Sequence, residues 1–523
     1  MIKKLRLFLL LNSIGSLSFA QLEYKDVAGI FFNRCASCHH NGGGAPFTLT
    51  TYASAYDQAA NIDYALSINH MPPWPADTNY RRFSHEHIIT ASEKAAIQSW
   101  VATGALAGDT TLAPAAPIYS QYRLTPPPDL ILKIPTFISN ATATQDAYDL
   151  FVIPSTLTTT RKIRAVEIVP GNPDIVHHAS VGADTNAAST SNLSGNAFTF
   201  PANVGIGGFT PGAEPIVFPN SSILKMGVTI KAGSQILIQI HYPAGTGGMV
   251  DSTQIRLYFY PTSTTGVREV YAFAPIQNWS YTLPPNQLTT VTADTNLLDW
   301  FSLSVFSTLP HSHKVCKSIL DYVYKDTSVT AGAPDTIPMM RINDWEFHWQ
   351  FYYYYRNLVK IPPGYRYHGE HIYDNTAANP NNPNSPPITI YPGVNSNDEM
   401  MYDSYQIMVY YPGDENINID SLLRVDPLLT AGVAEVVGSP KWTYSFSFPN
   451  PFSERTTIQV VSNELKGDLK LELYDASGKR VNADVQKNMN SFDLSKGSLS
   501  PGLYFYHILC DGKAISTGKI VAN

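Results

Sequence analysis

The chain contains very little cysteine, with four in 523 residues. Two of these, Cys35 and Cys38, lie close together, whereas Cys316 and Cys510 are far from each other and from that pair. Small secreted domains that depend on disulfides carry many more cysteines at closer spacing. The sequence therefore excludes a disulfide-stabilised scaffold, and we expect no disulfide between Cys316 and Cys510.

Charge and long apolar runs are also scarce. Charged residues make up 15% of the chain, and the net charge of −7 gives no reason to expect nucleic-acid binding. Beyond the N-terminus, no run of about 18 apolar residues is present, so the sequence predicts no transmembrane span. Aromatic residues reach 12%, with 38 prolines and 33 glycines. This composition favours β-rich domains with substantial cores, and the length allows for about three to four of them.

The first residues are typical of an export signal. A basic start precedes an apolar segment that begins at residue 7, and the small residue Ala20 stands before Gln21. We expect residues 1–20 to form a signal peptide, so that the mature chain acts outside the cytoplasm, secreted or at the cell surface after periplasmic transit.

A C-x-x-C-H motif follows at Cys35, Cys38 and His39. This spacing is typical of covalent attachment of a c-type haem, in which each thiol forms a thioether and the histidine ligates the iron. A zinc or redox C-x-x-C is the alternative, but zinc sites of this kind need a second such pair, which the chain lacks. The motif predicts one covalently bound haem c.

The second axial ligand is expected downstream of the motif, at Met71. His70, His85 and His87 compete with it, although a solvated loop pair is the simpler interpretation of His85 and His87. Helical spacing before the motif and a second helix near residues 92–101 complete the pattern. The segment resembles a small class I cytochrome c, which implies an all-α domain over residues 21–112.

The character of the chain changes after a linker at residues 113–127. Segments that alternate apolar and polar residues, such as 236–241 and 254–259, are separated by frequent turn signals. This pattern predicts antiparallel β-sandwiches.

Histidines in this region form an adjacent pair (His177 and His178), a single residue (His241) and an H-x-H triplet (His311 and His313). Alternate residues of a strand face the same side, so the triplet can share one metal ion. Adjacent residues can reach one ion only at a bulge or a strand end. Because a chain with 14 histidines contains such doublets by chance, metal binding and a structural role both remain open.

The order of these histidines, followed by Asp398-Glu399-Met400, resembles the copper type II, ascorbate-dependent monooxygenases, the family of peptidylglycine α-hydroxylating monooxygenase and dopamine β-monooxygenase. The resemblance covers about residues 128–430. It implies two tandem antiparallel, jelly-roll-like β-sandwich domains, over residues 128–275 and 276–432.

Carried over by position, the resemblance implies two copper ions. The implied ligands are His177, His178 and His241 for the electron-transfer copper, and His311, His313 and Met400 for the oxygen-binding, catalytic copper. Imidazole suits copper in both oxidation states, and a thioether favours the reduced form. Met401 competes with Met400 but should face the opposite side of its strand.

The chain departs from this family at two positions. Leu309 stands where the peptide-processing members have an arginine that grips the substrate carboxylate, and Cys316 replaces a small glycine. We therefore expect a different, apolar substrate. Cys316 has three readings: a buried packing residue, a reactive thiol or an accidental copper ligand. Tyr405 and Gln406 are candidates to support the site. The remaining histidines of the region are expected to be structural: His348, His368 and His371.

The last residues, 440–523, contain turn-and-strand signatures such as Phe448-Pro449-Asn450-Pro451-Phe452. In their order they resemble the C-terminal sorting domain of type IX secretion. This implies a small β-sandwich recognised by the type IX secretion machinery, with Cys510 as a strand residue.

The sequence thus predicts a secreted oxidoreductase, a copper-dependent monooxygenase. It would hydroxylate a C–H bond of a small-molecule or peptide substrate with dioxygen. Electrons from an external donor, ascorbate or a redox protein, would pass through the fused haem. The alternatives are a haem and copper electron-transfer or copper-binding surface protein without turnover, and a binding module in which the sandwiches are scaffolds.

Overall fold

The computed structural model divides the chain into two compact units, residues 1–434 and 435–523. The structure describes residues 21–41, 43–119, 123–296, 301–326, 335–430, 443–448, 450–462, 467–475, 478–488 and 490–523. The predicted signal peptide and part of the predicted linker lie outside these residues. Strands make up 41% of the chain and helices 12%, so the β-rich class predicted from composition is confirmed.

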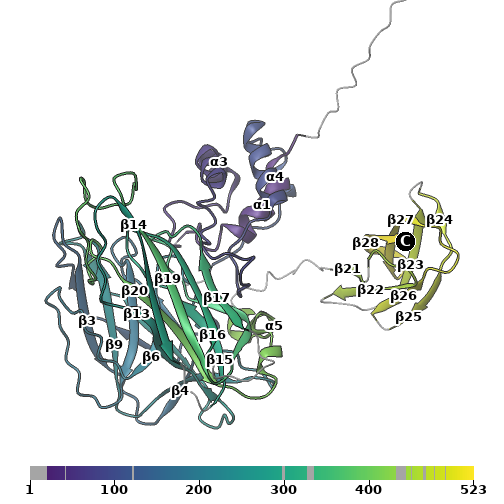
Figure 1. The fold of residues 1–523 in the computed structure, drawn as a ribbon. Helices are drawn as coiled ribbons and strands as arrows, with labels where there is room; N and C mark the ends of the chain where they lie inside the picture. Colours follow the sequence, from purple (N-terminus) through teal and green to yellow (C-terminus); the bar gives the residue numbers. More distant parts are fainter. Residues whose placement is uncertain are drawn as a thin grey trace, which may run out of the picture. The chain divides into compact units, whose positions relative to one another are not determined.

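The N-terminal module, residues 21–112, holds the first helices (Figure 1). α4 begins with a capping box in which Thr90 and Glu93 exchange hydrogen bonds with each other's backbone, which satisfies amide groups that a helix start leaves unpaired. Phe31 of α1 and Trp100 of α4 are fully buried and meet edge to face at 5.8 Å. The helices are α1 (Tyr24–Arg34), α2 (Tyr52–Asp57), α3 (Ala59–Ser67), α4 (Ala91–Ala102) and the short η1 (Thr110–Leu112).

Two sheets form the first sandwich, and its core is aliphatic. The strands pair antiparallel except β12, which runs parallel to β8. One sheet has the order β1 (Leu130–Lys133), β11 (Gln254–Phe259), β4 (Arg161–Val169), β8 (Met226–Ile230) and β12 (Arg268–Glu269), with β7 (Ile216–Val217) beside β4. The other has the order β3 (Ala147–Pro154), β9 (Gln235–Tyr242), β5 (His178–Asp184) and β6 (Val204–Phe209). A two-stranded ribbon joins β2 (Phe137–Ile138) and β10 (Val250–Asp251).

The second sandwich also consists of two sheets, and its core is richer in aromatic residues than that of the first. Buried and half-buried residues alternate along the whole of β19, as expected of a strand with one face on the core. One sheet has the order β13 (Tyr271–Asn278), β20 (Met401–Val409), β15 (Leu303–Leu309) and β18 (Tyr353–Ile361). The other has the order β14 (Gln287–Asn296), β19 (Tyr365–Asn375), β16 (Cys316–Lys325) and β17 (Thr336–Ile342).

The segment after β20 crosses back to the first sandwich. It contains η2 (Asp414–Asn416), α5 (Ile419–Arg424) and α6 (Pro427–Thr430). Leu423 and Leu428 belong to the core of the first sandwich, and Asp426 forms an ion pair with Arg164 at 2.5 Å. The range assigned from the sequence to the second copper domain therefore contributes its last helices to the first sandwich.

Part of the N-terminal module likewise packs on the second sandwich. Trp74 and Phe83 lie against the side chain of Tyr353, at 5.2 and 5.3 Å between ring centroids. Ala76 and Phe83 also form isolated backbone bridges to β17 and β18. We call residues 74–86 the docking segment. It contains no helix, and its apolar side chains belong to or pack against the core of the second sandwich.

The second unit is a small sandwich with a core of its own, which includes Ile458, Phe492, Leu494 and Ile508. Cys510 ends β27 and is half-buried. One sheet has the order β21 (Thr443–Phe448), β22 (Arg455–Ser462), β26 (Ser491–Ser495) and β25 (Asp484–Lys487), and the other β24 (Arg480–Val481), β23 (Leu469–Asp475), β27 (Gly502–Cys510) and β28 (Lys513–Ala522).

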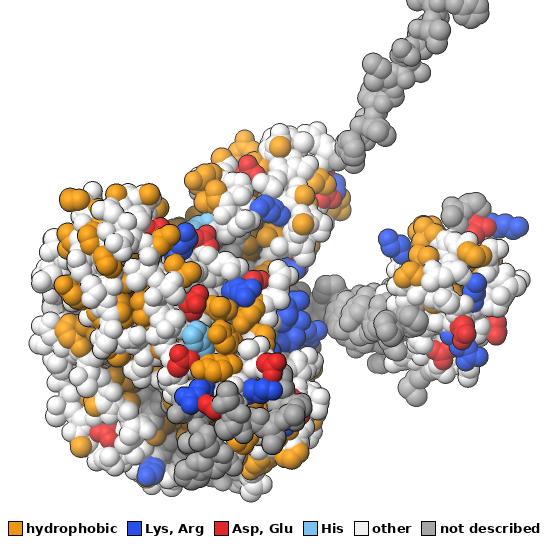
Figure 2. Space-filling model, viewed as in Figure 1, with side chains coloured by type: hydrophobic (Ala, Val, Ile, Leu, Met, Phe, Trp, Pro, Cys, Tyr) orange, Lys and Arg blue, Asp and Glu red, His pale blue; other side chains and the backbone are white. Residues whose placement is uncertain are grey.

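None of the helices that the structure describes is both long enough and apolar enough to cross a bilayer. On the face seen in Figure 2, acidic and basic side chains of the described residues are interspersed among apolar ones and form no extended basic surface.

Candidate metal centre and C-x-x-C-H cavity

His177, His178 and His241 come together at one edge of the first sandwich. His178 is the first residue of β5 and pairs directly with His241 of β9, while His177 lies just before the strand and donates its backbone N–H to the carbonyl of His241 at 3.1 Å. The ligand atoms of the three rings lie within 4.8 Å of one another. The strand end explains how two adjacent histidines reach one point, because His177 is released from the alternation of the pleat.

The electrostatics of this triad suit a bound cation. Both ring nitrogens of His177 are buried and have no hydrogen-bond partner among the described residues. Nε2 of His241 lies 3.3 Å from a carboxylate oxygen of Asp146. Burial, followed by the neighbouring imidazoles, holds the pKa of His177 and His178 well below the usual value. Neutral imidazoles with free lone pairs are the form that ligates a metal.

His311 and His313 lie in the loop between β15 and β16, with ring centroids 5.3 Å apart. His311 Nδ1 contacts Gln350 Oε1 at 2.5 Å, and His313 Nδ1 contacts the carbonyl of Asp398 at 3.2 Å. Each Nδ1–H therefore has an acceptor, which leaves the lone pair on Nε2 for a ligand. Burial lowers the pKa of His311 to about 4.

Met400 stands just before β20, next to the H-x-H loop. Its carbonyl accepts hydrogen bonds from Ser312 Oγ at 2.8 Å and from the Tyr373 hydroxyl at 2.7 Å. Met400 and His311 line the same cavity, of about 370 Å³. Met401, in contrast, is buried in the core of the second sandwich.

Glu399 fixes these two segments to each other. Its buried carboxylate accepts hydrogen bonds from the backbone N–H groups of His313, Val315 and Met400, at 2.5, 3.1 and 2.8 Å, and from Ser312 Oγ at 3.0 Å. Burial raises the pKa of Glu399 to about 7 in spite of these donors. The role of Glu399 was not predicted; a carboxylate beside a proposed ligand was the available signal.

The two triads are neighbours rather than separate centres. The rings of His178 and His311 are 5.9 Å apart, and both residues line the cavity that also contains Met400. We call His177, His178, His241, His311 and His313 the histidine cluster. The two sandwiches bring all five imidazoles and one thioether to a single region.

The cavity beside the histidine cluster has largely apolar walls. Leu309 lies in this wall and contributes an uncharged, apolar side chain. No charged side chain is among the described residues that line it. The Phe, Tyr and Trp residues of the wall are Tyr148, Phe198, Phe200, Phe209, Trp279, Tyr352 and Tyr402.

A second cavity, of about 390 Å³, lies at the C-x-x-C-H motif, and we call it the C-x-x-C-H cavity. Cys35, Cys38, His39 and Met71 all line it. His39 Nδ1 contacts the carbonyl of Phe47 at 3.1 Å, so its Nε2 carries the lone pair. The other lining residues include the apolar side chains Leu49, Ile62, Leu66 and Ile97. This donor set and these apolar walls fit a covalently bound haem.

The histidines that compete with Met71 as axial ligand differ in their positions relative to the C-x-x-C-H cavity. His70 and His87 line the C-x-x-C-H cavity, whereas His85 is exposed and has a positive φ of 53°. The interpretation of His87 as a solvated loop residue is therefore wrong, because it is half-buried in the cavity wall beside Trp74, at 5.9 Å between the rings.

The remaining predicted residues lie in varied surroundings. Cys316 is buried at the start of β16, as a packing residue would be, and burial raises the pKa of its thiol. His368 contacts Asp294 at 2.9 Å. His371 is buried between Asp403 and Tyr373. His348, which was expected to be structural, is exposed and lies beside His177, at 5.9 Å between ring centroids.

Tyr405 and Gln406 do not line the cavity. The Tyr405 hydroxyl donates to Asp321 at 2.7 Å in the core, and Gln406 accepts from Ser307 at 2.8 Å within the sheet. Both side chains support the sandwich behind the cluster. Asp321, His371 and Asp403 have ligand atoms within 4.8 Å of one another, and Asp403 also accepts the backbone N–H of His311 at 3.0 Å.

Residues 447–523 match the family model of the secretion system C-terminal sorting domain. No curated protein is similar enough to match. Among solved structures, a biofilm associated protein BSP domain is 7% identical, with a TM-score of 0.14 over 74% of this chain and 84% of that one. A β-glucuronidase from Ruminococcus gnavus is 11% identical, with a TM-score of 0.13 over 46% and 36%. The VP2 subviral particle of infectious bursal disease virus is 12% identical, with a TM-score of 0.18 over 59% and 77%. Scores this low carry no argument.

The sorting domain shows where the protein goes. It indicates secretion to the cell surface or the extracellular space, and interaction with the type IX secretion machinery. The localisation predicted from the sequence is therefore confirmed.

Proposed function

We propose that the chain is a secreted, copper-dependent monooxygenase that hydroxylates a C–H bond of an organic substrate with dioxygen, using electrons supplied through a covalently bound haem c. The observation that carries this proposal is that His178, His311 and Met400 line one cavity, with His177 and His241 clustered at His178 and His313 beside His311. The resemblance to the copper monooxygenases rests on the same six residues.

Copper bound at these positions would supply dioxygen binding and one-electron redox chemistry. Other residues of the chain orient the side chains that would ligate the copper. Gln350 and the Asp398 carbonyl accept the Nδ1–H groups of His311 and His313, so that both imidazoles present Nε2. Glu399 holds the histidine loop beside Met400, so the thioether and the imidazoles keep one mutual arrangement.

The cavity favours an apolar or aromatic substrate. Its aromatic walls offer stacking surfaces, and Leu309 offers no positive charge to a carboxylate. At the C-x-x-C-H cavity, Cys35 and Cys38 would form the thioethers, with His39 and Met71 as axial ligands.

Metal content and oxygen consumption test the proposal. The mature protein, loaded with copper, should contain two coppers for each haem and should consume dioxygen with a one-electron reductant and substrate. Met400→Leu should lower oxygen uptake at least several-fold while the haem absorbance spectrum stays unchanged. Met401→Leu is the matched control, because Met401 packs in the core and a volume-conserving change there is tolerated. Unchanged uptake by Met400→Leu would refute the assigned role.

A second candidate is an electron-transfer or copper-binding surface protein without turnover. The C-x-x-C-H cavity and the histidine cluster lie close to each other, on either side of residues 347–349. This arrangement would serve electron transfer with or without substrate. The two candidates differ in one result: the carrier would bind both metals and exchange electrons, yet form no hydroxylated product.

A further inference from the structure

A short segment, Phe347–Phe351, touches both the histidine cluster and the C-x-x-C-H cavity. It belongs to the connection between β17 and β18 and contains no strand. Phe347, His348 and Gln350 contact the cluster, whereas Trp349 lines the cavity. The two sites therefore share one wall, and it is only a few residues long.

On the side of the histidine cluster the contacts are close. The ring of Phe347 stacks on His177 at 4.8 Å between centroids, with 20° between the planes, and lies 6.1 Å from His313. Gln350 contacts His311 and donates its amide N–H to the carbonyl of Phe347 at 2.8 Å. This last bond ties the two contacts together.

On the side of the C-x-x-C-H cavity, Trp349 forms the wall together with Pro211 and Gly212 of the first sandwich. Its ring lies 6.1 Å from that of His70 and stacks on Phe351. The indole Nε1 is buried and has no hydrogen-bond partner among the described residues. A buried N–H group without an acceptor costs free energy of folding, unless a bound group accepts its hydrogen bond.

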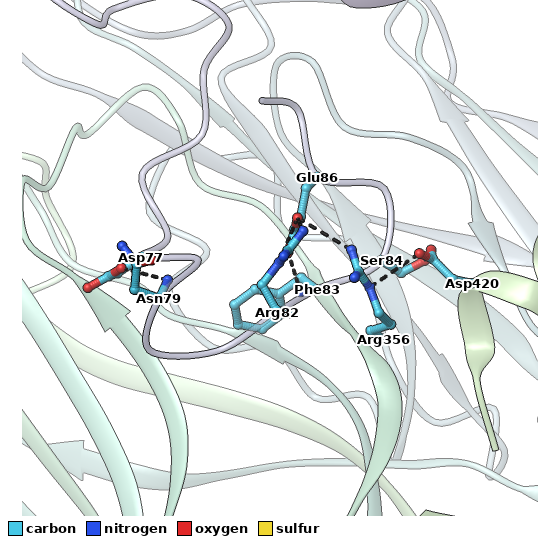
Figure 3. Close-up of polar contacts among 8 residues, drawn as sticks. All are labelled: Asp77, Asn79, Arg82, Phe83, Ser84, Glu86, Arg356 and Asp420. Atoms are coloured by element: carbon cyan, nitrogen blue, oxygen red, sulfur yellow. Dashed lines mark hydrogen bonds and ion pairs between the residues drawn. The ribbon is translucent and has the colours of Figure 1, made fainter. Parts of the chain in front are cut away.

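The docking segment holds the N-terminal module against this wall. Glu86, whose side chain is 4% exposed, pairs with Arg82 at 2.6 Å and with Arg356 of β18 at 3.5 Å, as Figure 3 shows. The Ser84 hydroxyl donates to Asp420 of α5 at 2.5 Å. A buried carboxylate with several donors fixes its neighbours far better than an exposed pair does.

We propose that Phe347–Gln350 is the path by which electrons pass from the haem to the histidine cluster, entering at Trp349 and leaving through Phe347 to His177. Electron tunnelling through protein falls steeply with distance. The short backbone from residue 347 to residue 349 joins a ring stacked on His177 to a ring in the wall of the C-x-x-C-H cavity. The inference rests on the proposed function, because it needs a redox metal at the cluster.

The transfer balances as a one-electron exchange. A ferrous haem held at the C-x-x-C-H motif would give up one electron and become ferric, and a cupric ion held by the histidine cluster would accept it and become cuprous, with no bond made or broken. Hydroxylation consumes two electrons and two protons to give the alcohol and water, so a one-electron external reductant must reduce the haem twice in each turnover.

Transient absorbance tests the path in the full-length, copper-loaded protein. The haem is reduced rapidly in the absence of oxygen, and its reoxidation by cupric copper is followed through the haem absorbance. Trp349→Leu and Phe347→Leu should each slow this reoxidation several-fold while the haem spectrum and the copper content stay unchanged. Wild-type rates in either variant, with both metals present, would overturn the proposal.

Tyr119→Leu is the control variant. Tyr119 stacks on His40 at 3.7 Å, next to the C-x-x-C-H motif, but does not line the cavity or touch the segment. It removes an aromatic ring near the haem and should leave the rate unchanged. An equal slowing in Tyr119→Leu would contradict a specific path.

The outcomes separate the path from the proposed function. If the wild-type haem is reduced and copper is bound, yet copper does not oxidise the haem, the path is wrong, while a monooxygenase reduced directly by its donor survives. Fast reoxidation without hydroxylated product supports the path and rejects the monooxygenase. If the Trp349 variant does not fold, Phe347→Leu alone decides.

Discussion

At the residue scale, the candidate metal centre depends on side chains that are not ligands. Glu399 joins the H-x-H loop to Met400, Gln350 sets the tautomer of His311, and Asp146 lies against His241. Apart from the bond between the neighbours Glu399 and Met400, these contacts link residues far apart in the sequence. Their removal should therefore disturb the ligands without deleting any of them.

Glu399→Gln is expected to destabilise the protein. The change replaces one carboxylate oxygen by an NH₂ group, which faces backbone N–H donors that then lose their acceptor. A buried donor left unpaired costs about 1–3 kcal/mol. Urea unfolding of the metal-free protein should show a loss of this order. Glu370→Gln, on the less buried face of β19, is the control and should change the free energy of unfolding little. Equal effects of the two changes would contradict the role of Glu399.

The histidine cluster also predicts acid sensitivity of the metal-free protein. Burial holds the pKa of His177, His178 and His313 well below the ordinary 6.5, and that of His311 at about 4. From pH 6.5 down to about 4, the unfolded chain binds protons on these imidazoles and the folded chain does not. The free energy of unfolding therefore rises with pH in this window.

Glu399 opposes this trend, because its raised pKa lets the folded chain bind one proton that the unfolded chain releases above about pH 4.5. Several imidazoles outweigh one carboxyl. The Tm of the metal-free protein should fall as the pH is lowered from 7 to 5, measured by calorimetry. His313→Asn, with one buried imidazole fewer, should show a smaller fall. A Tm that is flat or rises over this range would contradict the prediction.

At the scale of elements, the docking segment decides how the N-terminal module meets the second sandwich. Backbone hydrogen bonds join Ser84 to Tyr354 at 2.6 Å and Asp77 to Arg341 at 2.8 Å. Phe83 is fully buried. The segment therefore acts as an added edge to the second sandwich.

Glu86→Gln is expected to loosen this docking. The carboxylate accepts from Arg82, Arg356 and the backbone N–H of Phe83 at 2.8 Å, and the amide can satisfy only some of these donors. We expect a loss of about 1–3 kcal/mol and faster hydrogen exchange at residues 82–86, with an unchanged haem spectrum. Glu23→Gln, in the more exposed pair with Lys25, should cost less, about 0–1 kcal/mol. Unchanged exchange at residues 82–86 would count against the docking role of Glu86.

Elements that depend on local sequence patterns could be predicted, whereas elements that depend on contacts between distant residues could not. The alternating residues 236–241 predicted a strand because sequence periodicity is a local property, although β9 is buried on both faces along most of its length. The docking segment was not predictable, because Trp74 and Phe83 find their partners some 270 residues later in the chain, at Tyr353. The same holds for Glu399, Gln350 and Phe347, whose partners lie in other strands and loops.

At the scale of the whole molecule, two sandwiches and a helical module are joined through shared cores. The order of the histidines in the sequence suggested two triads. In the structure the ligand atoms of His177, His178 and His241 lie within 4.8 Å of one another, and the rings of His311 and His313 are 5.3 Å apart. The sequence did not suggest that the two groups of histidines adjoin, because the rings of His178 and His311 meet across two different sandwiches. The C-terminal unit is different, since the described residues that form the core of its sandwich all belong to that unit.

This separation predicts the effect of removing the C-terminal unit. A chain that ends at residue 434 should keep the haem spectrum, the copper stoichiometry and the Tm of the first unit, because both units have cores of their own. It should no longer reach the cell surface or the medium, since residues 447–523 match the sorting domain. Fractionation of cells that express the truncated and full-length chains, followed by haem staining, measures this.

A full-length chain with Ile508→Asp, which places an unpaired charge in the core of the sorting domain, should be retained in the same way. Truncated protein in the medium in wild-type amounts would show that export does not depend on this unit.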